Sequence, residues 1–271
     1  MTQDNADLRG IEATAVELAT LAGSEIALAL GGLLEVRYKA KAGIESLRDP
    51  VSEVDEKVER MIRTVLSDRF PDHGIIGEEM DDRPAAKGSA YVWAVDPVDG
   101  TTNFINGFPM VAGSIGVLRD GVPVVGAIWC STGHALRPGV YHGRSGGDLM
   151  FEGETLKRSG NSAVRRRLVG LPAPAAATGP WDARKTGSAA IECAFVAAGL
   201  LEAARFEAPN IWDVAAGLAL LPLVGGTVLE QQDERWTSFE GFGPPDTQRG
   251  WSKPLILGTA SESTLREHLG G

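Results

Sequence analysis

The sequence contains few cysteines. Only Cys130 and Cys193 are present, without a CxxC pair and without a Cys/His cluster of zinc-ligand spacing. A zinc-binding module is therefore excluded, because such modules gather Cys and His ligands at short, regular spacings. We expect both cysteines to be small buried residues.

Long apolar runs and a targeting segment are also lacking. No apolar run reaches the roughly 20 residues that a membrane-spanning helix requires. Residues 1–10 are polar and acidic, whereas a secretory signal starts with basic residues and continues with apolar ones. We therefore expect no membrane contact, and the cytoplasm is the default location.

An excess of positive charge is missing too. The chain has 26 Lys and Arg against 36 Asp and Glu, a formal net charge of -10. Nucleic-acid surfaces use clustered Lys and Arg that neutralise phosphates, so we expect no nucleic-acid partner. A carboxylate-rich protein that handles phosphate needs cations as intermediaries.

The composition is that of an ordinary folded protein. Of the 271 residues, 43% are hydrophobic and 23% are charged, which excludes a disordered chain. A chain of this length forms either one large α/β domain or two smaller domains that share an interface.

Apolar residues recur at helical spacing in two early segments, 7–34 and 52–68. Ser52 suits the N-cap of the second helix, and Asp55 completes a start that resembles a capping box. Between the two helices, residues 37–49 are rich in charge and poor in large apolar side chains. We expect a mobile loop or loose hairpin there.

Two short apolar segments, predicted as strands, are each followed directly by acidic residues. Residues 74–77 end in Glu78 and Glu79, and residues 91–95 end in Asp96. Open sheets commonly bind ligands beyond the carboxyl ends of their strands. These acids are therefore candidates for a site at one sheet edge.

The rest of the chain alternates predicted strands and helices, so the fold class is layered α/β. Residues 171–180 are of low complexity and predict a surface loop near the midline. Predicted strands are 110–117 and 122–129, antiparallel around the turn 119–121, then 139–142, 202–206, 225–229 and 255–258; predicted helices are 188–199 and 213–224.

The stretch from Asp96 to Asn103 carries the strongest chemical signal. Asp96 and Asp99 flank a proline, directly after a strand and directly before Gly100 and Thr101. Such a turn can direct two carboxylates and a peptide carbonyl at one hard divalent cation. Gly100 and Thr101 would offer backbone N–H groups to phosphate oxygens. Taken alone, the motif is also a common turn.

Five motifs in chain order resemble those of the inositol monophosphatase family, the lithium-sensitive, magnesium-dependent phosphatases. The segments are 49–55, 77–79, 93–104, 186–190 and 211–217. The resemblance implies a layered αβαβα sandwich of the inositol monophosphatase and fructose-1,6-bisphosphatase type. It further implies two halves, 1–150 with most metal ligands and 151–271 with Asp213 and substrate contacts, in one compact catalytic unit.

The resemblance implies two to three Mg²⁺ ions per site. One would be held by Glu78, Asp96 and the carbonyl of Val98, and a second by Asp96, Asp99 and Asp213. A weaker third would use Glu78 through water, with Asp49 and either Lys39 or Lys41 nearby. Li⁺ is the expected inhibitor, acting at the second site.

The implied mechanism is in-line attack on phosphorus by a water molecule that the metal activates. The implied catalytic residues are Asp55, Thr101, Glu78 and Asp49. Thr101, hydrogen-bonded to Asp55, would orient and deprotonate the water. Asp55 is also explained as an acid at a helix start, and both roles are compatible.

The substrate contacts implied by the resemblance are Asp99, Gly100, Thr101, Thr102, Ser188, Ala190, Glu207 and Asp213. Glu207 carries the most weight, because a carboxylate accepts two hydroxyl hydrogen bonds and so recognises a polyol. Its alternative is a surface acid at a strand end.

The implied function is hydrolysis of a small polyol phosphate monoester, with inositol 1-phosphate as first choice. Histidinol phosphate, fructose 1,6-bisphosphate and other sugar phosphates are alternatives, and a regulatory protein with a retained phosphatase fold is a non-enzymatic one. The residues after Thr101 lean away from nucleotides. We expect a homodimer, and structural roles for His134 and His142, which lie in a region that departs from the family pattern.

Overall fold

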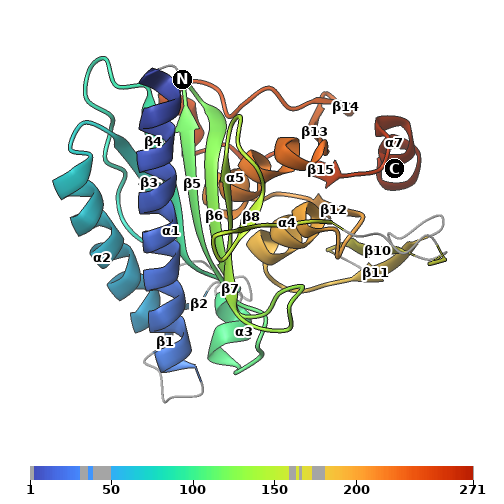
Figure 1. Cartoon of the computed structure of the whole chain (residues 1–271), viewed down its shortest axis with the longest axis horizontal. Helices are drawn as coiled ribbons and strands as arrows, with labels where there is room; N and C mark the ends of the chain where they lie inside the picture. The colour runs from blue at the N-terminus through green and yellow to red at the C-terminus, as the bar shows by residue number, and fades with distance from the viewer. Residues whose placement is uncertain are drawn as a thin grey trace.

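The computed structural model describes residues 3–30, 36–38, 50–158, 163–164, 167–172 and 181–270. Asp49, Lys39 and Lys41 lie outside the described residues. The chain forms five layers in which helices alternate with two sheets (Figure 1). The expected αβαβα sandwich is thereby confirmed.

The first layer contains α1 (Gln3–Ala29) and α2 (Glu53–Arg69). Helix α2 begins as expected, because Ser52 is its N-cap and Asp55 closes a capping box. Helix α1 starts and ends about four to five residues earlier than its apolar pattern suggested. Between the helices, β1 (Val36–Tyr38) pairs antiparallel with β2 (Pro50–Ser52), as a hairpin requires.

A seven-stranded sheet forms the second layer, with its strands in sequence order. Helix α1 packs on β5, β6 and β7, and α2 packs on β4. Among the described strands of this sheet, β3 and β4 form the only parallel pair. The strands are β3 (Gly74–Gly77), β4 (Tyr91–Asp99), β5 (Ala112–Arg119), β6 (Val122–Cys130), β7 (Gly139–Arg144), β8 (Met150–Phe151) and β9 (Glu154–Thr155).

Strand β4 is longer than the sequence pattern suggested. The apolar run ends at Val95, but pairing with β5 continues to Asp99 across a register shift between Asp96 and Asp99. A bulge of this kind accommodates Pro97 and re-aims the neighbouring side chains. The acidic motif therefore lies within a strand end and not in a free turn.

The middle layer contains α4 (Ala189–Ala198) and α5 (Ile211–Leu220), which continues into a 3-10 turn, η3 (Leu221–Val224). Pro222 ends the regular helix earlier than predicted. Cys193 of α4 packs so closely on Gly217 of α5 that a Cβ there would lie 2.2 Å from its Cβ. Both cysteines are free and buried, as expected.

A six-stranded sheet and α7 (Glu262–Leu269) complete the layers, with α7 packed on β15. Strands β10, β11 and β14 and helix α7 were not predicted; of the loop 171–180, only 171 and 172 are described. The sheet order is β11 (Trp181–Arg184), β10 (Arg167–Gly170), β12 (Ala203–Phe206), β15 (Leu255–Gly258), β13 (Thr227–Gln232) and β14 (Arg235–Ser238).

Candidate active site

Two acids leave adjacent parallel strands at the same sheet edge. Gly77 at the end of β3 is in register with Val95 of β4, so Glu78 and Asp96 follow side by side. The backbone N–H of Glu78 donates to the carbonyl of Val95 at 3.2 Å. The sheet edge thus brings together the two acids that the strand pattern predicted.

The bulge of β4 arranges the next groups. Asp96 is buried, and its Oδ1 accepts a hydrogen bond from the N–H of Val98 at 3.1 Å. Gly100, with φ of 90°, is the N-cap of the short helix α3 (Thr101–Ile105). At its start, the hydroxyl of Thr101 lies 3.0 Å from the carbonyl oxygen of Val98.

Asp55, in the first turn of α2, contacts the Thr101 hydroxyl. Its Oδ1 lies 3.2 Å from the Thr101 hydroxyl, and its Oδ2 accepts from both the N–H and the hydroxyl of Ser52. Burial raises the pKa of Asp55 to about 6, against the opposing hydrogen bonds from Ser52. One carboxylate therefore closes the capping box and contacts Thr101 at once.

Asp99 connects the strand to the middle layer. It accepts hydrogen bonds from the hydroxyl of Ser188, from the N–H of Ala190 at 2.7 Å and from the N–H of Ala189 at 3.3 Å, all at the start of α4. Burial raises its pKa to about 6, although these bonds favour the charged form. The structure therefore joins Asp99 to two other predicted site residues, Ser188 and Ala190, which lie about 90 positions further along the sequence.

Asp213 lies in the first turn of α5. Its Oδ2 accepts from the N–H of Asn210 at 2.7 Å, which completes a capping box. The carbonyl of the preceding Trp212 accepts a hydrogen bond from the buried Ser114 of β5 at 3.3 Å. Burial, followed by the charge of Asp99, raises the pKa of Asp213 well above its usual value.

The acids form one electrostatic cluster. The pKa of Asp96 is raised well above the ordinary range, first by burial and then by repulsion from Glu78, Asp99, Asp213 and Asp55. Like charges at this density destabilise one another unless protons or cations neutralise them. Carboxylate oxygens are the ligands that Mg²⁺ prefers, so the donor set fits this ion.

The carboxylate oxygens of these acids do not form a complete metal-coordination site in the described structure. Among the residues that the structure describes, no three or more His, Cys, Asp or Glu side chains are grouped as a metal site. Asp99 directs its oxygens at the start of α4, and Asp213 directs Oδ2 at Asn210.

A cavity of about 310 Å³ opens beside Asp213 and is also lined by Ser188 and Glu207. Glu207 is exposed, and its Oε1 is ion-paired with Arg205 Nε at 2.9 Å. One oxygen of the predicted polyol acceptor is thus already engaged. Thr102 is exposed, and its carbonyl accepts from the side chain of Asn106.

Several supporting residues were not predicted. Glu59 of α2, fully buried, accepts from the N–H of Glu79 at 2.8 Å and from Arg63 at 2.8 Å, and so holds the loop that carries Glu78. Asn103 donates to the carbonyls of Met110 and Thr186 at 2.8 Å each. The i,i+4 spacing of Glu59 and Arg63 was the signal available for that pair, and Asn103 ends the motif that begins at Asp96.

The two histidines of the atypical region have structural partners. His134 Nδ1 lies 2.9 Å from the hydroxyl of Tyr141. His142 Nδ1 lies 2.8 Å from Glu12 Oε1 of helix α1. Each histidine thus has a side-chain partner, as the expected structural role requires.

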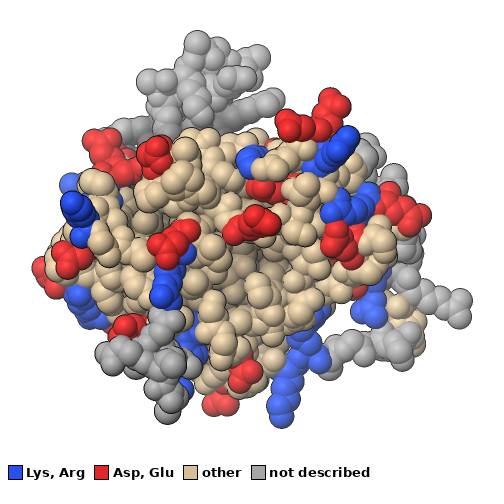
Figure 2. Space-filling model, turned by 90° about the horizontal axis from the view of Figure 1, so that it is seen from above, with Lys and Arg blue, Asp and Glu red and all other residues tan. Residues whose placement is uncertain are grey.

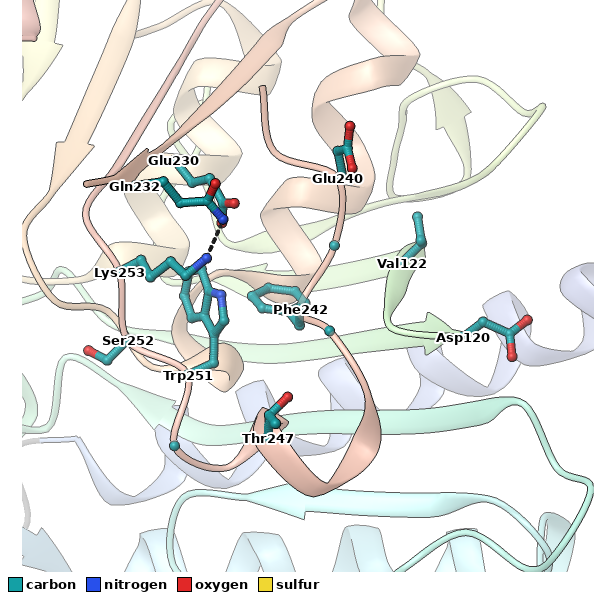
Figure 3. Close-up of a pocket in the computed structure, with 13 residues that line it drawn as sticks. Asp120, Val122, Glu230, Gln232, Glu240, Phe242, Thr247, Trp251, Ser252 and Lys253 are labelled. Carbon is teal, nitrogen blue, oxygen red and sulfur yellow. Dashed lines mark hydrogen bonds and ion pairs between the residues drawn. The ribbon is translucent and has the colours of Figure 1, made fainter. Parts of the chain in front are cut away.

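A second cavity, of about 610 Å³, lies elsewhere and contains none of the predicted site residues. In it the buried Glu230 is paired with Lys253 at 3.2 Å, and the rings of Phe242 and Trp251 pack edge to face (Figure 3). On the face shown in Figure 2, the described Lys and Arg side chains lie among acidic ones and form no continuous basic surface.

This sandwich, with buried acids at the junction of a sheet edge and two helix starts, suits a metal-dependent phosphatase. The chain belongs to the inositol monophosphatase family, whose model it matches over residues 7–249. Members of this family are phosphoric monoester hydrolases, so the non-enzymatic alternative is set aside. No helix among the described residues is long and apolar enough to cross a membrane.

Curated relatives support the family, and a solved structure supports the fold. The chain is 31% identical to an inositol-1-monophosphatase of Rhizobium meliloti over 85% of this chain and 86% of that one. It is 31% identical to a fructose-1,6-bisphosphatase/inositol-1-monophosphatase of Aquifex aeolicus over 78% and 82%. An inositol monophosphatase structure from Anabaena superposes with a TM-score of 0.72 at 24% identity, covering 97% and 95% of the chains.

Proposed function

We propose that the protein hydrolyses a small polyol phosphate monoester in the presence of Mg²⁺, with inositol 1-phosphate as first substrate. The observation that carries this proposal is the cluster of Asp96, Asp99 and Asp213, which repel one another, beside a cavity lined by Ser188 and Glu207. A cation is needed before such a cluster can accept a phosphate dianion.

Glu78, Asp96 and the carbonyl of Val98 would hold one Mg²⁺. Asp96, Asp99 and Asp213 would hold a second, and a weaker third would lie near Glu78. When bound, Mg²⁺ supplies neutralising charge and lowers the pKa of water. Li⁺ competing at the second position should inhibit turnover, which a Li⁺ titration at fixed Mg²⁺ tests.

The chain's own groups position the attack. Thr101 and Asp55 are bonded to each other and would hold the attacking water, with Asp55 as proton acceptor. Asp99 at the end of β4 and Ser188 at the start of α4 would face the alcohol half of the substrate in this arrangement. Glu207 would accept a substrate hydroxyl with Oε2, because Oε1 is paired with Arg205.

Fructose 1,6-bisphosphate is the second candidate. Lys185 and Arg205 line the same cavity. Because Arg205 is ion-paired with Glu207, Lys185 is the residue that adds positive charge there, which suits a substrate with a second phosphate. The Aquifex aeolicus relative carries both activities in its name. Histidinol phosphate is the third compound to compare.

A phosphate-release assay on these three compounds, with Mg²⁺ and with chelator, tests the proposal. We expect Mg²⁺-dependent turnover, with inositol 1-phosphate ahead. A tenfold advantage in kcat/KM for another compound, about 1.4 kcal/mol, would replace the first choice. The cytoplasmic location and the homodimer stay predictions; sedimentation velocity tests the latter.

A further inference from the structure

Arg249 touches two segments that each precede a proposed metal ligand. It follows helix α6 (Pro245–Gln248), and its Nη1 donates a hydrogen bond to the carbonyl of Gly77, directly before Glu78. Its guanidinium carbon lies 4.6 Å from the ring centroid of Trp212, directly before Asp213. One planar cation therefore joins the end of β3 to the start of α5.

The contact with Gly77 falls on an open strand edge. Strand β3 is the outer strand of its sheet, so one side of its backbone pairs with no other strand of the described chain. On that side Arg83 pairs with Ile75 through two backbone bonds, and Arg249 supplies the donor for Gly77. The hydrogen bond from Arg249 to the Gly77 carbonyl is a strong one, because the donor is charged.

The loop bearing Glu78 is anchored on both sides. Glu59 accepts from the N–H of Glu79, and Arg63 donates to the carbonyl of Met80 at 3.2 Å, both from α2. Arg249 holds the same loop from the C-terminal part of the chain. Removing Arg249 therefore leaves the α2 anchors intact but releases the loop from α5.

The backbone next to Arg249 is held by hydrogen bonds. The neighbouring Gln248 is fully buried and donates to the carbonyl of Gly243 at 3.1 Å, and the N–H of Trp251 donates to the carbonyl of Gln248 at 3.1 Å. Trp251 also belongs to the wall of the cavity in Figure 3. Asp82 pairs with Arg249 at 3.1 Å on the solvent side, where an ion pair contributes little.

We propose that Arg249 is a positioning residue of the metal site, which sets the separation between Glu78 and Asp213. This inference rests on the proposed function, since it takes both acids as Mg²⁺ ligands. Residues that orient ligands in this way are needed for affinity, although they never touch the ion. A stacked guanidinium is also poorly replaced by lysine.

The test compares Arg249→Gln with Arg69→Gln, which removes an exposed arginine paired with Glu17 at 2.6 Å. Mg²⁺ binding is measured by titration calorimetry, alongside the Mg²⁺ dependence of phosphate release. We expect about tenfold weaker Mg²⁺ binding for Arg249→Gln, with kcat at saturating Mg²⁺ near that of the wild type. Arg69→Gln should bind like the wild type.

Arg249→Lys keeps the charge and loses the stacking on Trp212, so it should recover part of the affinity. It also serves if Arg249→Gln does not fold, since unaltered Mg²⁺ affinity in the lysine variant would equally argue against the role. Wild-type affinity in folded Arg249→Gln would overturn the inference. Absence of Mg²⁺ binding in the wild type would instead refute the proposed function.

Discussion

Thr101 and Asp55 are hydrogen-bonded at 3.2 Å across 46 positions of sequence. The Thr101 hydroxyl also lies 3.0 Å from the carbonyl of Val98. A hydroxyl has one proton, so these two acceptors share it. If the carbonyl of Val98 bound a cation, Asp55 would be the remaining acceptor, and the hydroxyl oxygen would be left to accept a hydrogen bond from water.

Thr101→Val should therefore lower kcat by about 10²-fold or more, as expected when a proton-transfer pair is lost. Asp55→Asn should lower it similarly. Steady-state phosphate release measures both effects. Thr101→Ser keeps the hydroxyl and is the matched control; activity in Thr101→Val within twofold of that control would argue against the pair.

Asp96→Asn should abolish Mg²⁺-dependent turnover while the fold is retained. Without Mg²⁺ the variant should be at least as stable as the wild type at pH 8, because one of the buried acids that repel each other is gone. Circular dichroism and urea denaturation in chelator measure this. Unchanged turnover would contradict the assignment of Asp96.

Added Mg²⁺ should stabilise the wild type and not Asp96→Asn. At 100 times the dissociation constant, binding contributes about 2.7 kcal/mol. For a chain of this size that corresponds to a rise in Tm of roughly 5–10 °C. Differential scanning calorimetry at several Mg²⁺ concentrations checks it, and an equal rise in both proteins would place the cation elsewhere.

Glu192 predicts a pH dependence of stability. Burial raises its pKa from 4.5 to about 7, against hydrogen bonds from Thr186. The native state therefore holds the proton more tightly than the unfolded chain, and stability is lost as pH rises from about 4.5 to about 7. Glu192→Gln removes this loss, because the amide stays neutral.

The free energy of unfolding of Glu192→Gln should exceed that of the wild type at pH 8 by about 1–3 kcal/mol, and the two should converge near pH 4.5. Urea denaturation at both pH values measures the difference. An equal difference in free energy at pH 8 and at pH 4.5 would show that the pKa of Glu192 is the same in the native and the unfolded state.

Gly217 tests the packing of α4 on α5. In Gly217→Ala the new Cβ would lie 2.2 Å from Cys193 Cβ, so we expect destabilisation of about 1–3 kcal/mol or more from overpacking. Gly10→Ala in α1 is the control, because outside its own turn of helix no atom of the described residues lies within 4 Å of the added Cβ. It should stabilise by up to about 1 kcal/mol, and similar effects at both positions would contradict the packing argument.

Local patterns predicted much of the fold. The capping box at Ser52 and the apolar strands before Glu78 and Asp96 depend on near neighbours, so the sequence carries them directly. Strands β10, β11 and β14 are four residues each and lack a clear alternation. Their pairing is determined by the sheet that they join, and no local signal marks it.

The sequence around Glu207 contained a signal for its ion pair that the prediction of its role did not use. Arg205 and Glu207 are two positions apart, the spacing that places side chains on the same side of a strand. Their ion pair at 2.9 Å follows from that spacing. The role of Glu207 as a polyol acceptor stays a prediction, with Oε1 already paired with Arg205.

The sequence by itself determined which acids this protein has and that they follow strands or start helices, because motifs and periodicity are local. Tertiary structure alone decided which distant groups meet them. Asp99 is hydrogen-bonded to the start of α4 across 89 positions, and Arg249 reaches Trp212 across 37 positions and Gly77 across 172. Such contacts arise only when the layers pack, since burial of apolar faces, and not the chain between the partners, brings them together.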